Sequence, residues 1–449
     1  MTISRTICLG FLAVIAAGTL LLLMPFSYGD EAVFRNPIAT VVTALFTSTS
    51  AVCVTGLSVV NVGEYYSFWG QFVMVLLVEV GGLGYMTATT ILLLLIGRKF
   101  GLRDKLALQQ SLDTSGLGGV VSLVKSIIAT TILFQLTGAF LLLIVFVPDY
   151  GFDQGLWLSI FHSVNGFNNA GFSLFGDNLI QYVTSPLVNF TITGLIIFGG
   201  LGYQVIIELY LWIRERLSRS RCHREFSLLF KVVTTTTLFL LIFGTILILS
   251  VEYNNPDTLE SLTLPEKIMA AWFQSVTSRT AGFNTIDIGR MTSAGLFVTN
   301  ILMFIGASPG STGGGIKTTT ARILLRCTRA TLQGRDEVLC YQRKIPAPLI
   351  LKAISVLVGS SIVVFVSTLL VSLFQSNLEF EQILFEIVSA FATVGLSTGI
   401  TGSLSVPSQL VVIATMYIGR VGVLLLVLAI MGDPKPTSVE YPEENLLVG

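Results

Sequence analysis

Residues 168–173, which read NNAGFS, form a short polar segment with one glycine between two long apolar runs. Stretches of the same form occur in matching surroundings at three other places: CVTGLS (53–58), RTAGFN (279–284) and ATVGLS (392–397). We call these four stretches the glycine turns. Successive turn glycines are 115, 111 and 113 residues apart: Gly56, Gly171, Gly282 and Gly395. This near-constant spacing predicts one structural unit that is repeated four times.

The composition is that of an integral membrane protein. Of the 449 residues, 53% are hydrophobic and 12% are charged, whereas an average soluble domain has about 25% charged residues. The mean hydropathy is +0.81. A net charge of zero gives no reason to expect a nucleic-acid partner. The five cysteines form no CxxC pair, which indicates neither a disulfide framework nor a zinc site.

Long apolar runs occur eight times, and each is long enough for a membrane-spanning helix of about 20 residues. They cover 6–27, 68–96, 126–148, 186–213, 229–251, 293–325, 347–374 and 407–431. The first run lacks a convincing cleavage site, so it is interpreted as a helix rather than a signal peptide. A shorter, less apolar segment separates the two runs of each pair: 38–52, 155–168, 265–278 and 381–392. These segments are too short to cross about 30 Å of hydrocarbon, and they are predicted to be re-entrant half-helices.

The predicted fold is therefore an all-α membrane protein of four tandem membrane–pore–membrane repeats. Eight transmembrane helices and four re-entrant pore helices would surround one pseudo-fourfold pore. The predicted repeats cover residues 1–97, 98–213, 214–325 and 326–449. Basic residues gather after the even-numbered runs, for example at 98–105 and 214–224, and the opposite loops are acidic or uncharged. By the positive-inside rule, both termini are expected in the cytoplasm of a multi-pass protein of the inner (plasma) membrane.

The glycine turns need a reason to exist at membrane depth. Irregular backbone is tolerated there only where protein buries it or where it lines a watery cavity. Glycine allows consecutive carbonyl groups to face one side and brings no side chain into a pore. The alternative is that these glycines serve helix packing alone, which explains four turns in register less well. A second set of glycines follows the turn glycines by 25, 28, 24 and 24 residues, within VGGLGY (80–85), FGGLGY (198–203), IGASPG (305–310) and IGRVG (418–422).

These motifs also carry a resemblance to a known family. The TVG at 393–395 matches the opening of the potassium-channel TVGYG filter, and SVTSRTAGFNT (275–285) and GASPGSTGGGIKT (306–318) are more specific motifs. Over nearly its whole length the chain resembles the Trk/Ktr/HKT superfamily of cation transporters, and in its eight-helix length the KtrB-like potassium-translocating subunits. The resemblance implies a K+ selectivity filter made of three residues from each turn: Val54, Thr55, Gly56, Asn169, Ala170, Gly171, Thr280, Ala281, Gly282, Thr393, Val394 and Gly395.

The filter residues bear on which ion passes. Family members with serine in place of the first filter glycine tend toward sodium, so Gly56 implies potassium. The residues that follow the turn glycines replace the Tyr-Gly of a potassium channel, which makes the expected filter degenerate: Leu57, Phe172, Phe283 and Leu396.

The third unit departs from the other three. After residue 305 the chain reads GASPGSTGGGIKTTT, with Pro309 and five glycines between positions 306 and 315, and a helix cannot continue through this composition. The stretch nearly matches a nucleotide-binding Walker A pattern, but Ile316 interrupts the pattern and no βαβ unit surrounds it. We call residues 306–318 the intramembrane loop. The resemblance implies that it gates the pore, with these residues: Gly306, Ser308, Gly310, Ser311, Thr312, Gly313, Gly314, Gly315, Lys317 and Arg420.

Arg420 is a lone cation about halfway along the apolar run 407–431. A charge at the bilayer centre costs about 2.5–3.5 kcal/mol or more, so it is expected to face protein or water. Two roles remain open. The arginine is a structural partner for a carboxylate such as Glu79 or for loop carbonyls, or, as the resemblance implies, it guards the pore beside the intramembrane loop.

Three further side chains receive plainer interpretations. Arg279 lies just before the expected filter residues of the third turn and is expected to pair with an acidic neighbour, since a cation in the pore would oppose conduction. His162 is expected to be a hydrogen-bonded packing residue because no histidine cluster exists. Cys53 is expected to be a small packing residue.

The function predicted on these grounds is potassium uptake. The alternatives are a sodium or less selective monovalent cation transporter, a channel-like subunit of an ATP-driven potassium pump, and a non-transporting membrane enzyme or receptor. An enzyme is not expected, because the chain has no HExxH motif, no paired His/Cys ligands and no nucleophile with a nearby base.

The predicted partners follow from the resemblance. It implies a homodimer on a cytoplasmic ring of KtrA-type nucleotide-binding regulatory subunits. K+ is the expected transported ion and Na+ a candidate activator. The chain has no Rossmann fingerprint in a soluble region, so no nucleotide is expected to bind to the chain itself. Membrane lipids are expected partners, and nucleic acid is not.

Overall fold

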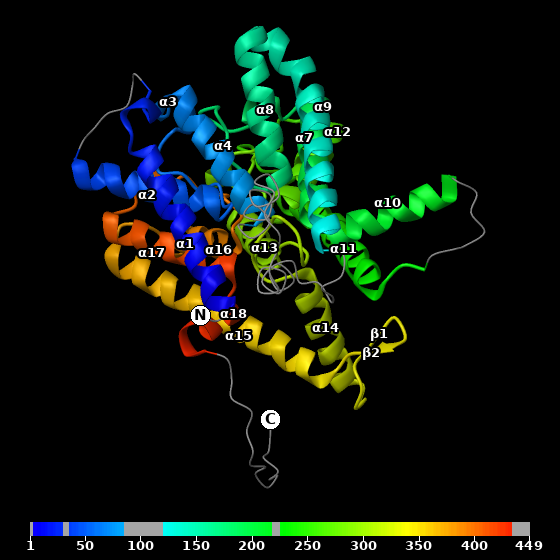
Figure 1. Ribbon diagram of the computed structural model, residues 1–449. Coiled ribbons are helices and arrows are strands. Elements are labelled where there is room, and N and C mark those ends of the chain that lie inside the picture. The colour runs from blue at the N-terminus through cyan, green and yellow to red at the C-terminus, as the bar shows by residue number, and fades with distance from the viewer. Residues whose placement is uncertain (1–2, 30–35, 85–119, 218–224, 433–449) are drawn as a thin grey trace.

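The structure, a computed structural model, describes residues 3–29, 36–84, 120–217 and 225–432. Helices dominate these ranges (Figure 1), and the single sheet within them is a two-stranded hairpin of β1 (Leu339–Cys340) and β2 (Arg343–Lys344). The predicted all-α class is confirmed. The whole of the predicted basic segment 98–105, and residues 218–224 of the second basic segment, lie outside the described residues.

Each unit opens with a long apolar helix. These helices are α1 (Ile3–Leu22), α7 (Val120–Tyr150), α11 (Leu228–Glu252) and α15 (Ala347–Phe374). All four are long and apolar enough to cross a membrane. A helix rises about 1.5 Å per residue, so their lengths suit a hydrocarbon core of about 30 Å.

A shorter helix follows in each unit. We call these helices the pore helices after their predicted role: α2 (Pro37–Val52), α8 (Phe152–Asn168), α12 (Leu264–Thr277) and α16 (Phe380–Ala392). They confirm the helices predicted at 38–52, 155–168, 265–278 and 381–392. Two of them start at sequence signals for a helix N-terminus: Asn36 caps α2, and Thr263 with Glu266 forms a capping box on α12.

The second apolar helices are α4 (Phe68–Leu83), α9 (Pro186–Leu201), α13 (Ser293–Phe304) and α17 (Val406–Val421). The expectation of one unbroken helix over 186–213 and over 407–431 is wrong. The chain bends by 103° between α9 and α10 (Tyr203–Leu217), and by 94° between α17 and α18 (Val423–Met431). In the described ranges four helices could span a membrane alone, or six spans result if each bent pair counts as one.

The bends have a backbone cause. Gly202 and Gly422 both have φ 90°, with ψ 141° and 137°, and Gly84 at the end of α4 has φ 80° and ψ 136°. No helix passes through such a conformation, and residues with a Cβ rarely adopt it. The part of the predicted run 68–96 beyond Gly84 lies outside the described residues. The predicted break of the third unit is confirmed, because α13 ends at Phe304 and α14 (Thr318–Leu332) begins at Thr318.

The remaining elements are short. They are α3 (Val62–Tyr65) and the 3-10 helices η1 (Pro25–Ser27), η2 (Ile180–Tyr182), η3 (Ile288–Arg290) and η4 (Thr401–Ser403). With the exception of η1, each follows a glycine turn and precedes a second helix. They shape the segments that return from the turns.

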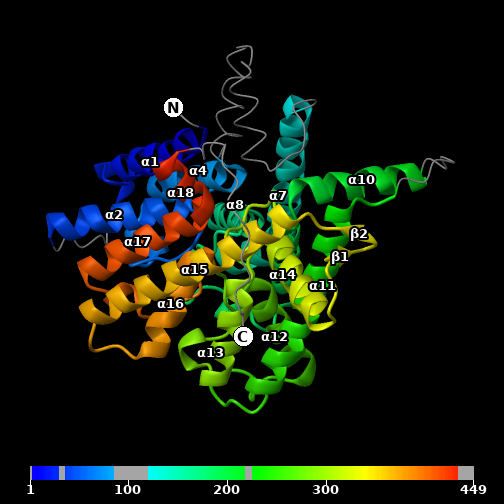
Figure 2. The same cartoon turned by 90° about the horizontal axis from the view of Figure 1, so that it is seen from below.

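The helices of successive units pack in a closed order. The second helix of each unit contacts the pore helix of the next: α4 packs on α8, α9 on α12, α13 on α16, and α17 on α2. Figure 2 shows the closing contact, with α2, α17, α15 and α16 side by side. The four units therefore surround a common centre, at which their glycine turns meet.

The second set of glycines fits each second helix against its own pore helix. A Cβ atom built on Gly81, Gly199 or Gly419 would lie 2.1, 1.9 or 1.8 Å from a carbonyl oxygen near the end of the pore helix. Those oxygens belong to Val52, Phe167 and Phe391. Real Cβ atoms do not approach an oxygen so closely, so these positions require glycine.

Candidate ion pathway

The four glycine turns share one pattern of positive φ angles. In each turn a residue other than glycine has a positive φ, and the turn glycine two positions later also has a positive φ. The first set is Val54 (56°), Asn169 (60°), Thr280 (70°) and Thr393 (52°), and the glycines are Gly56 (93°), Gly171 (72°), Gly282 (80°) and Gly395 (93°). Left-handed conformations are rare for residues with a Cβ, and strained backbone of this kind clusters at functional sites.

The turn glycines bring the four turns together in a ring. A Cβ atom built on each would collide with a carbonyl oxygen of the next turn: Ala170 at 2.2 Å from Gly56, Ala281 at 2.5 Å from Gly171, Val394 at 2.4 Å from Gly282, and Thr55 at 2.1 Å from Gly395. The order runs from the first turn through the fourth and back to the first. The structure thus places all twelve predicted filter residues at one locus, and the side chains of Thr55, Ala170, Ala281 and Val394 are fully buried there.

Each turn is fixed to the end of its pore helix. In three turns the amide before the turn glycine donates to a carbonyl five residues back, as from Thr55 N to Ser50 O (2.8 Å). The first and fourth turns add a side-chain bond, because the Gly56 and Gly395 amides donate to the hydroxyls of Ser50 (3.0 Å) and Ser389 (3.1 Å). In the third turn the corresponding bond reaches back four residues, from Ala281 N to Thr277 O (3.0 Å).

The intramembrane loop lies directly against the ring. A Cβ built on Gly313 would lie 2.0 Å from the Thr280 hydroxyl oxygen, and one built on Gly314 would lie 2.4 Å from that of Thr393. These threonines are the left-handed residues of the third and fourth turns. Glycine at both loop positions is what permits this close approach.

Backbone hydrogen bonds join the loop to the bend of the second unit. The amides of Ser308 and Thr312 donate to the carbonyls of Gly200 (3.1 Å) and Gly199 (3.3 Å). In return the Tyr203 amide, at the start of α10, donates to the Gly310 carbonyl (3.1 Å). The loop and the second helix of unit 2 therefore share one network.

The polar side chains of the loop find partners inside it. The Thr318 hydroxyl donates to Ser308 Oγ (3.1 Å), the Ser311 hydroxyl donates to the Ser308 carbonyl (2.6 Å), and Lys317 Nζ donates to the Gly313 carbonyl (2.7 Å). Ser308 and Thr312 are fully buried. The loop is therefore closely packed and internally hydrogen-bonded.

Arg420 links three parts of the site. Its guanidinium group donates to the carbonyl of Thr312 in the loop and to the carbonyl of Gly81 in α4. Of the structural partners considered from the sequence, the loop carbonyl is found, whereas Glu79 accepts a hydrogen bond from Gln135. The arginine fork suits two acceptors that come from different chain segments.

The prediction of an acidic partner for Arg279 is wrong. This buried guanidinium donates to the carbonyl of Gly306 (3.2 Å), the first residue of the loop. A backbone carbonyl replaces a carboxylate because the loop, and not an acidic segment, lies beside the third turn. The packing role predicted for Cys53 is confirmed, since it is fully buried and unpaired.

His162 is hydrogen-bonded and fully buried, as predicted. Its Nδ1 lies 2.8 Å from the Leu158 carbonyl and its Nε2 lies 3.0 Å from the Ser173 hydroxyl. A carbonyl oxygen only accepts, so Nδ1 carries a proton, and in the neutral ring Nε2 accepts from the serine. In the part of the chain that the structure describes, no three His, Cys, Asp or Glu side chains are grouped as metal ligands.

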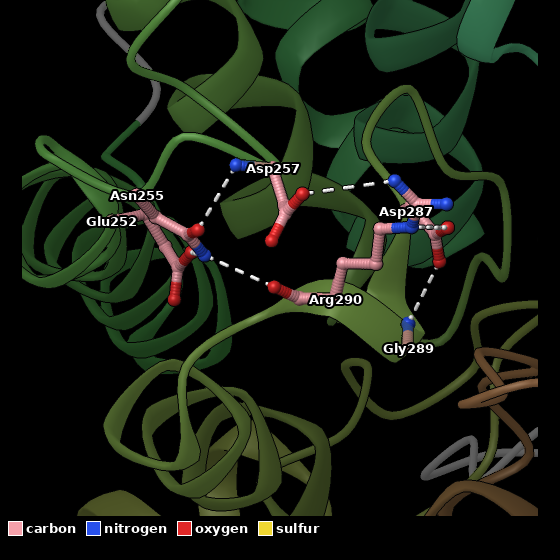
Figure 3. Close-up of polar contacts among 6 residues, drawn as sticks. All are labelled: Glu252, Asn255, Asp257, Asp287, Gly289 and Arg290. Atoms are coloured by element: carbon pink, nitrogen blue, oxygen red, sulfur yellow. Dashed lines mark hydrogen bonds and ion pairs between the residues drawn. The ribbon is translucent and has the colours of Figure 1, made fainter.

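A polar network fixes the segment that follows the third turn, and Figure 3 shows the part of it around Asn255 and Arg290. Glu252, fully buried at the end of α11, accepts hydrogen bonds from Asn255, Thr258 and the amide and hydroxyl of Thr292. Asn255 also donates to the Arg290 carbonyl (3.0 Å). The Arg290 side chain forms exposed ion pairs with two aspartates, Asp257 (3.6 Å) and Asp287 (3.3 Å).

Sequence reasoning missed a buried carboxyl group in the fourth unit. Glu386 lies in α16, is 1% exposed, and accepts a hydrogen bond from Thr401 in the segment after the fourth turn. A signal for it existed, because an acidic residue inside a segment predicted at membrane depth is itself a candidate for a functional role.

Comparison with known proteins places this geometry in context. A family model described as "Cation transport protein" and named TrkH matches residues 16–441. The chain is 38% identical to the Ktr system potassium uptake protein B of Bacillus subtilis, over 99% of this chain and 96% of that protein. It is 37% identical to the potassium/sodium uptake protein NtpJ of Enterococcus hirae, over 99% of this chain and 97% of the relative.

A solved structure is also similar. The crystal structure of the potassium transporter TrkH from Vibrio parahaemolyticus matches with a TM-score of 0.72, at 18% sequence identity, over 95% of this chain and 84% of that chain. At this identity the match bears on the fold alone. It agrees with the helical membrane architecture described above.

Proposed function

The chain belongs to the TrkH family of cation transport proteins, and from this premise we propose that it takes up potassium across the plasma membrane. The observation that carries the proposal is the closed ring of four glycine turns. Potassium is the ion for two reasons: relatives that cover almost the whole chain are named potassium uptake proteins, and the first turn has Gly56 rather than serine.

The ring acts as the selectivity filter. Carbonyl oxygens of the three residues in each turn replace the hydration shell of the ion. The repeated left-handed conformation supports this. Regular extended backbone points successive carbonyls to alternate sides, whereas a positive φ at two positions of each turn brings them to one side. The residues are the twelve of the ring: Val54, Thr55, Gly56, Asn169, Ala170, Gly171, Thr280, Ala281, Gly282, Thr393, Val394 and Gly395.

The intramembrane loop and Arg420 act as the gate. The loop packs against the left-handed threonines of two turns, and Arg420 adds a positive charge at the same place. A potassium ion that leaves the ring would meet hydrogen-bond donors, the positive charge of Arg420 and the packed atoms of the loop. Together these raise the free-energy barrier to conduction. Opening requires the loop to leave its contacts with Gly199, Gly200 and Arg420.

A cytoplasmic partner controls the gate. Two relatives of this chain are named as parts of a Ktr system, which supports a homodimer on a KtrA-type nucleotide-binding ring. These cytoplasmic subunits would contact the basic segments, among them 326–346, which follows directly from the loop through α14. The four repeats keep the boundaries 1–97, 98–213, 214–325 and 326–449, and both termini lie in the cytoplasm.

One observation favours a second candidate, a transporter that also carries or responds to sodium. NtpJ, a relative at 37% identity, is named a potassium/sodium uptake protein. The two candidates differ in a measurable quantity, the ratio of potassium to sodium uptake by the purified chain.

The test is uptake into liposomes that contain the chain, under gradients of potassium or of sodium. Gly56→Ser is expected to lower the preference for potassium by about tenfold or more, because the Cβ meets the Ala170 carbonyl and displaces one quarter of the ring. Gly151→Ser is the control, since Gly151 also has a positive φ (82°) but no atom within 4 Å of a built Cβ. An unchanged preference in folded Gly56→Ser protein contradicts the filter assignment.

Partner control has its own test in the same liposomes. Addition of the cytoplasmic subunit and its nucleotide is expected to change the rate of uptake and leave the ion preference unaltered. Full, nucleotide-insensitive uptake with and without that subunit contradicts the regulatory assignment.

A further inference from the structure

The four pore helices carry a buried polar residue at matching positions. Thr47, His162, Gln274 and Glu386 precede their turn glycines by nine, nine, eight and nine residues, and each is at most 1% exposed. The single difference of one residue agrees with the third turn, where the bond to the pore helix also spans one residue fewer. The four side chains are therefore buried at equivalent positions of the repeat.

In the second unit this position ties the pore helix to the far side of the turn. His162 Nε2 accepts from the hydroxyl of Ser173 (3.0 Å), which lies two residues after Gly171. The serine oxygen in turn accepts from the Phe175 amide (3.1 Å). The segment that leaves the second turn is fixed in direction by this contact.

In the fourth unit Glu386 performs the same task with a carboxyl group. The Thr401 hydroxyl donates to Glu386 Oε1 and lies 2.9 Å from the hydroxyl of Ser397, which is two residues after Gly395. Ser397 Oγ also accepts from the Gly399 amide (3.0 Å). Because the Gly395 amide is bonded to Ser389 of the same helix, α16 fixes the fourth turn on both sides of its glycine.

A contribution to stability does not by itself explain the contact between Glu386 and Thr401. Glu386 Oε2 is buried and has no hydrogen-bond partner among the described residues. Burial of a carboxyl group with one unsatisfied oxygen opposes folding, and an apolar side chain of similar size would avoid this penalty. The arrangement is better explained by its effect on the segment that Thr401 and Ser397 belong to.

We propose that Glu386 is a positioning residue of the fourth glycine turn. Its bond to Thr401, and the contact of Thr401 with Ser397, set the direction of the backbone that follows Gly395. The carbonyls of this quarter of the ring are thereby aligned for potassium rather than sodium. The inference rests on the proposed filter and adds a determinant of selectivity outside the ring.

The experiment measures potassium and sodium uptake by the full chain in liposomes. Glu386→Leu removes the acceptor, and it is expected to lower the preference for potassium by about tenfold, the factor that one lost hydrogen bond to a buried carboxyl group represents. Glu386→Gln keeps an acceptor oxygen and is expected to restore most of the preference. Thr401→Val removes the donor from the other side and is expected to match Glu386→Leu, and the double variant should lose no more than either one.

Glu379 supplies the matched control. It lies at the start of the same helix, is exposed, and makes no side-chain cap bond to α16, so Glu379→Leu and Glu379→Gln are expected to keep the wild-type preference. Thermal unfolding of each variant is measured in parallel. A lower preference with an unchanged or higher Tm for Glu386→Leu supports positioning, since a purely structural role predicts loss of Tm instead.

The outcomes separate this inference from the filter itself. If Gly56→Ser lowers the preference but neither Glu386→Leu nor Thr401→Val does, Glu386 is not a positioning residue and the filter stands. Equal loss in Glu386→Gln and Glu386→Leu also overturns the inference, because the acceptor oxygen would then be irrelevant. If none of these variants, Gly56→Ser included, alters the preference, the filter assignment fails and the inference falls with it.

Discussion

The second helices of the repeats break in two different ways. In units 2 and 4 a single glycine, Gly202 or Gly422, turns the chain by 103° or 94°, and Gly84 has the same conformation in unit 1. In unit 3 the break takes residues 305–317, which separate α13 from α14. A single glycine redirects the chain, whereas the longer break leaves a stretch of backbone free to occupy the space against the ring.

The contrast extends to what each second helix rests on. Gly81, Gly199 and Gly419 pack on carbonyls of their own pore helices, but Gly306 packs on Gly314 of the intramembrane loop, at 2.2 Å from a built Cβ. The loop thus occupies a position that the end of a pore helix has in the other units. The third unit therefore lacks one internal contact of the repeat, and its loop lies against the ring instead.

Removal of the loop should have the largest effect. Deletion of residues 309–313 joins two points that are already close, since the Ala307 amide bonds to the Gly314 carbonyl (3.3 Å). Potassium flux is expected to rise by at least about tenfold, a barrier reduction of roughly 1.4 kcal/mol. The preference for potassium should be retained because the ring is untouched. Slower uptake by a deletion protein that inserts and unfolds normally would count against the gate.

Neutralisation of Arg420 should have the next largest effect. Arg420→Gln removes the charge and the two-carbonyl contact, and flux is expected to rise about fivefold, or roughly 1 kcal/mol. Arg420→Lys keeps the charge without the fork and should lie between wild type and Arg420→Gln. Arg5→Gln is the control, because Arg5 also donates to two carbonyls, Ala429 (2.7 Å) and Ile430 (3.3 Å), in an exposed place. Equal effects at the two arginines would remove the case for a pore role.

The smallest predicted effect is a difference between alanine variants at the two bends, Gly202 and Gly422. A Cβ on Gly202 would lie 2.5 Å from the Pro309 carbonyl of the loop, whereas nothing lies within 4 Å of one on Gly422. Both alanine variants are expected to lose about 1–2 kcal/mol of stability from a positive φ. Gly202→Ala alone should alter flux, by about twofold, because it displaces the loop. Thermal unfolding and potassium uptake of both variants are measured together. Altered flux in Gly422→Ala would contradict the prediction, because a bend without a loop contact would then also affect the gate.

The sequence predicted the site better than it predicted the helices around it. The turn glycines and the break in unit 3 were recognisable because glycine and proline act through the local backbone, which the chain itself specifies. The bends at Gly202 and Gly422 were missed, since a lone glycine within an apolar run is equally compatible with a straight helix. Arg279 was assigned an acidic partner because the sequence could not show that the loop folds back beside the third turn.

By itself the sequence determined that the chain is a helical membrane protein of four related units with a glycine turn in each. Hydropathy is averaged over neighbouring residues, and the spacing of the turn glycines is counted along the chain, so neither requires knowledge of a tertiary contact. Only the tertiary structure decided that the turns close into one ring, that the loop lies against Thr280 and Thr393, and that Arg420 bonds to Thr312 and Gly81. These contacts join residues that lie far apart in the sequence, and their geometry depends on how helices from different units pack, which local sequence does not encode.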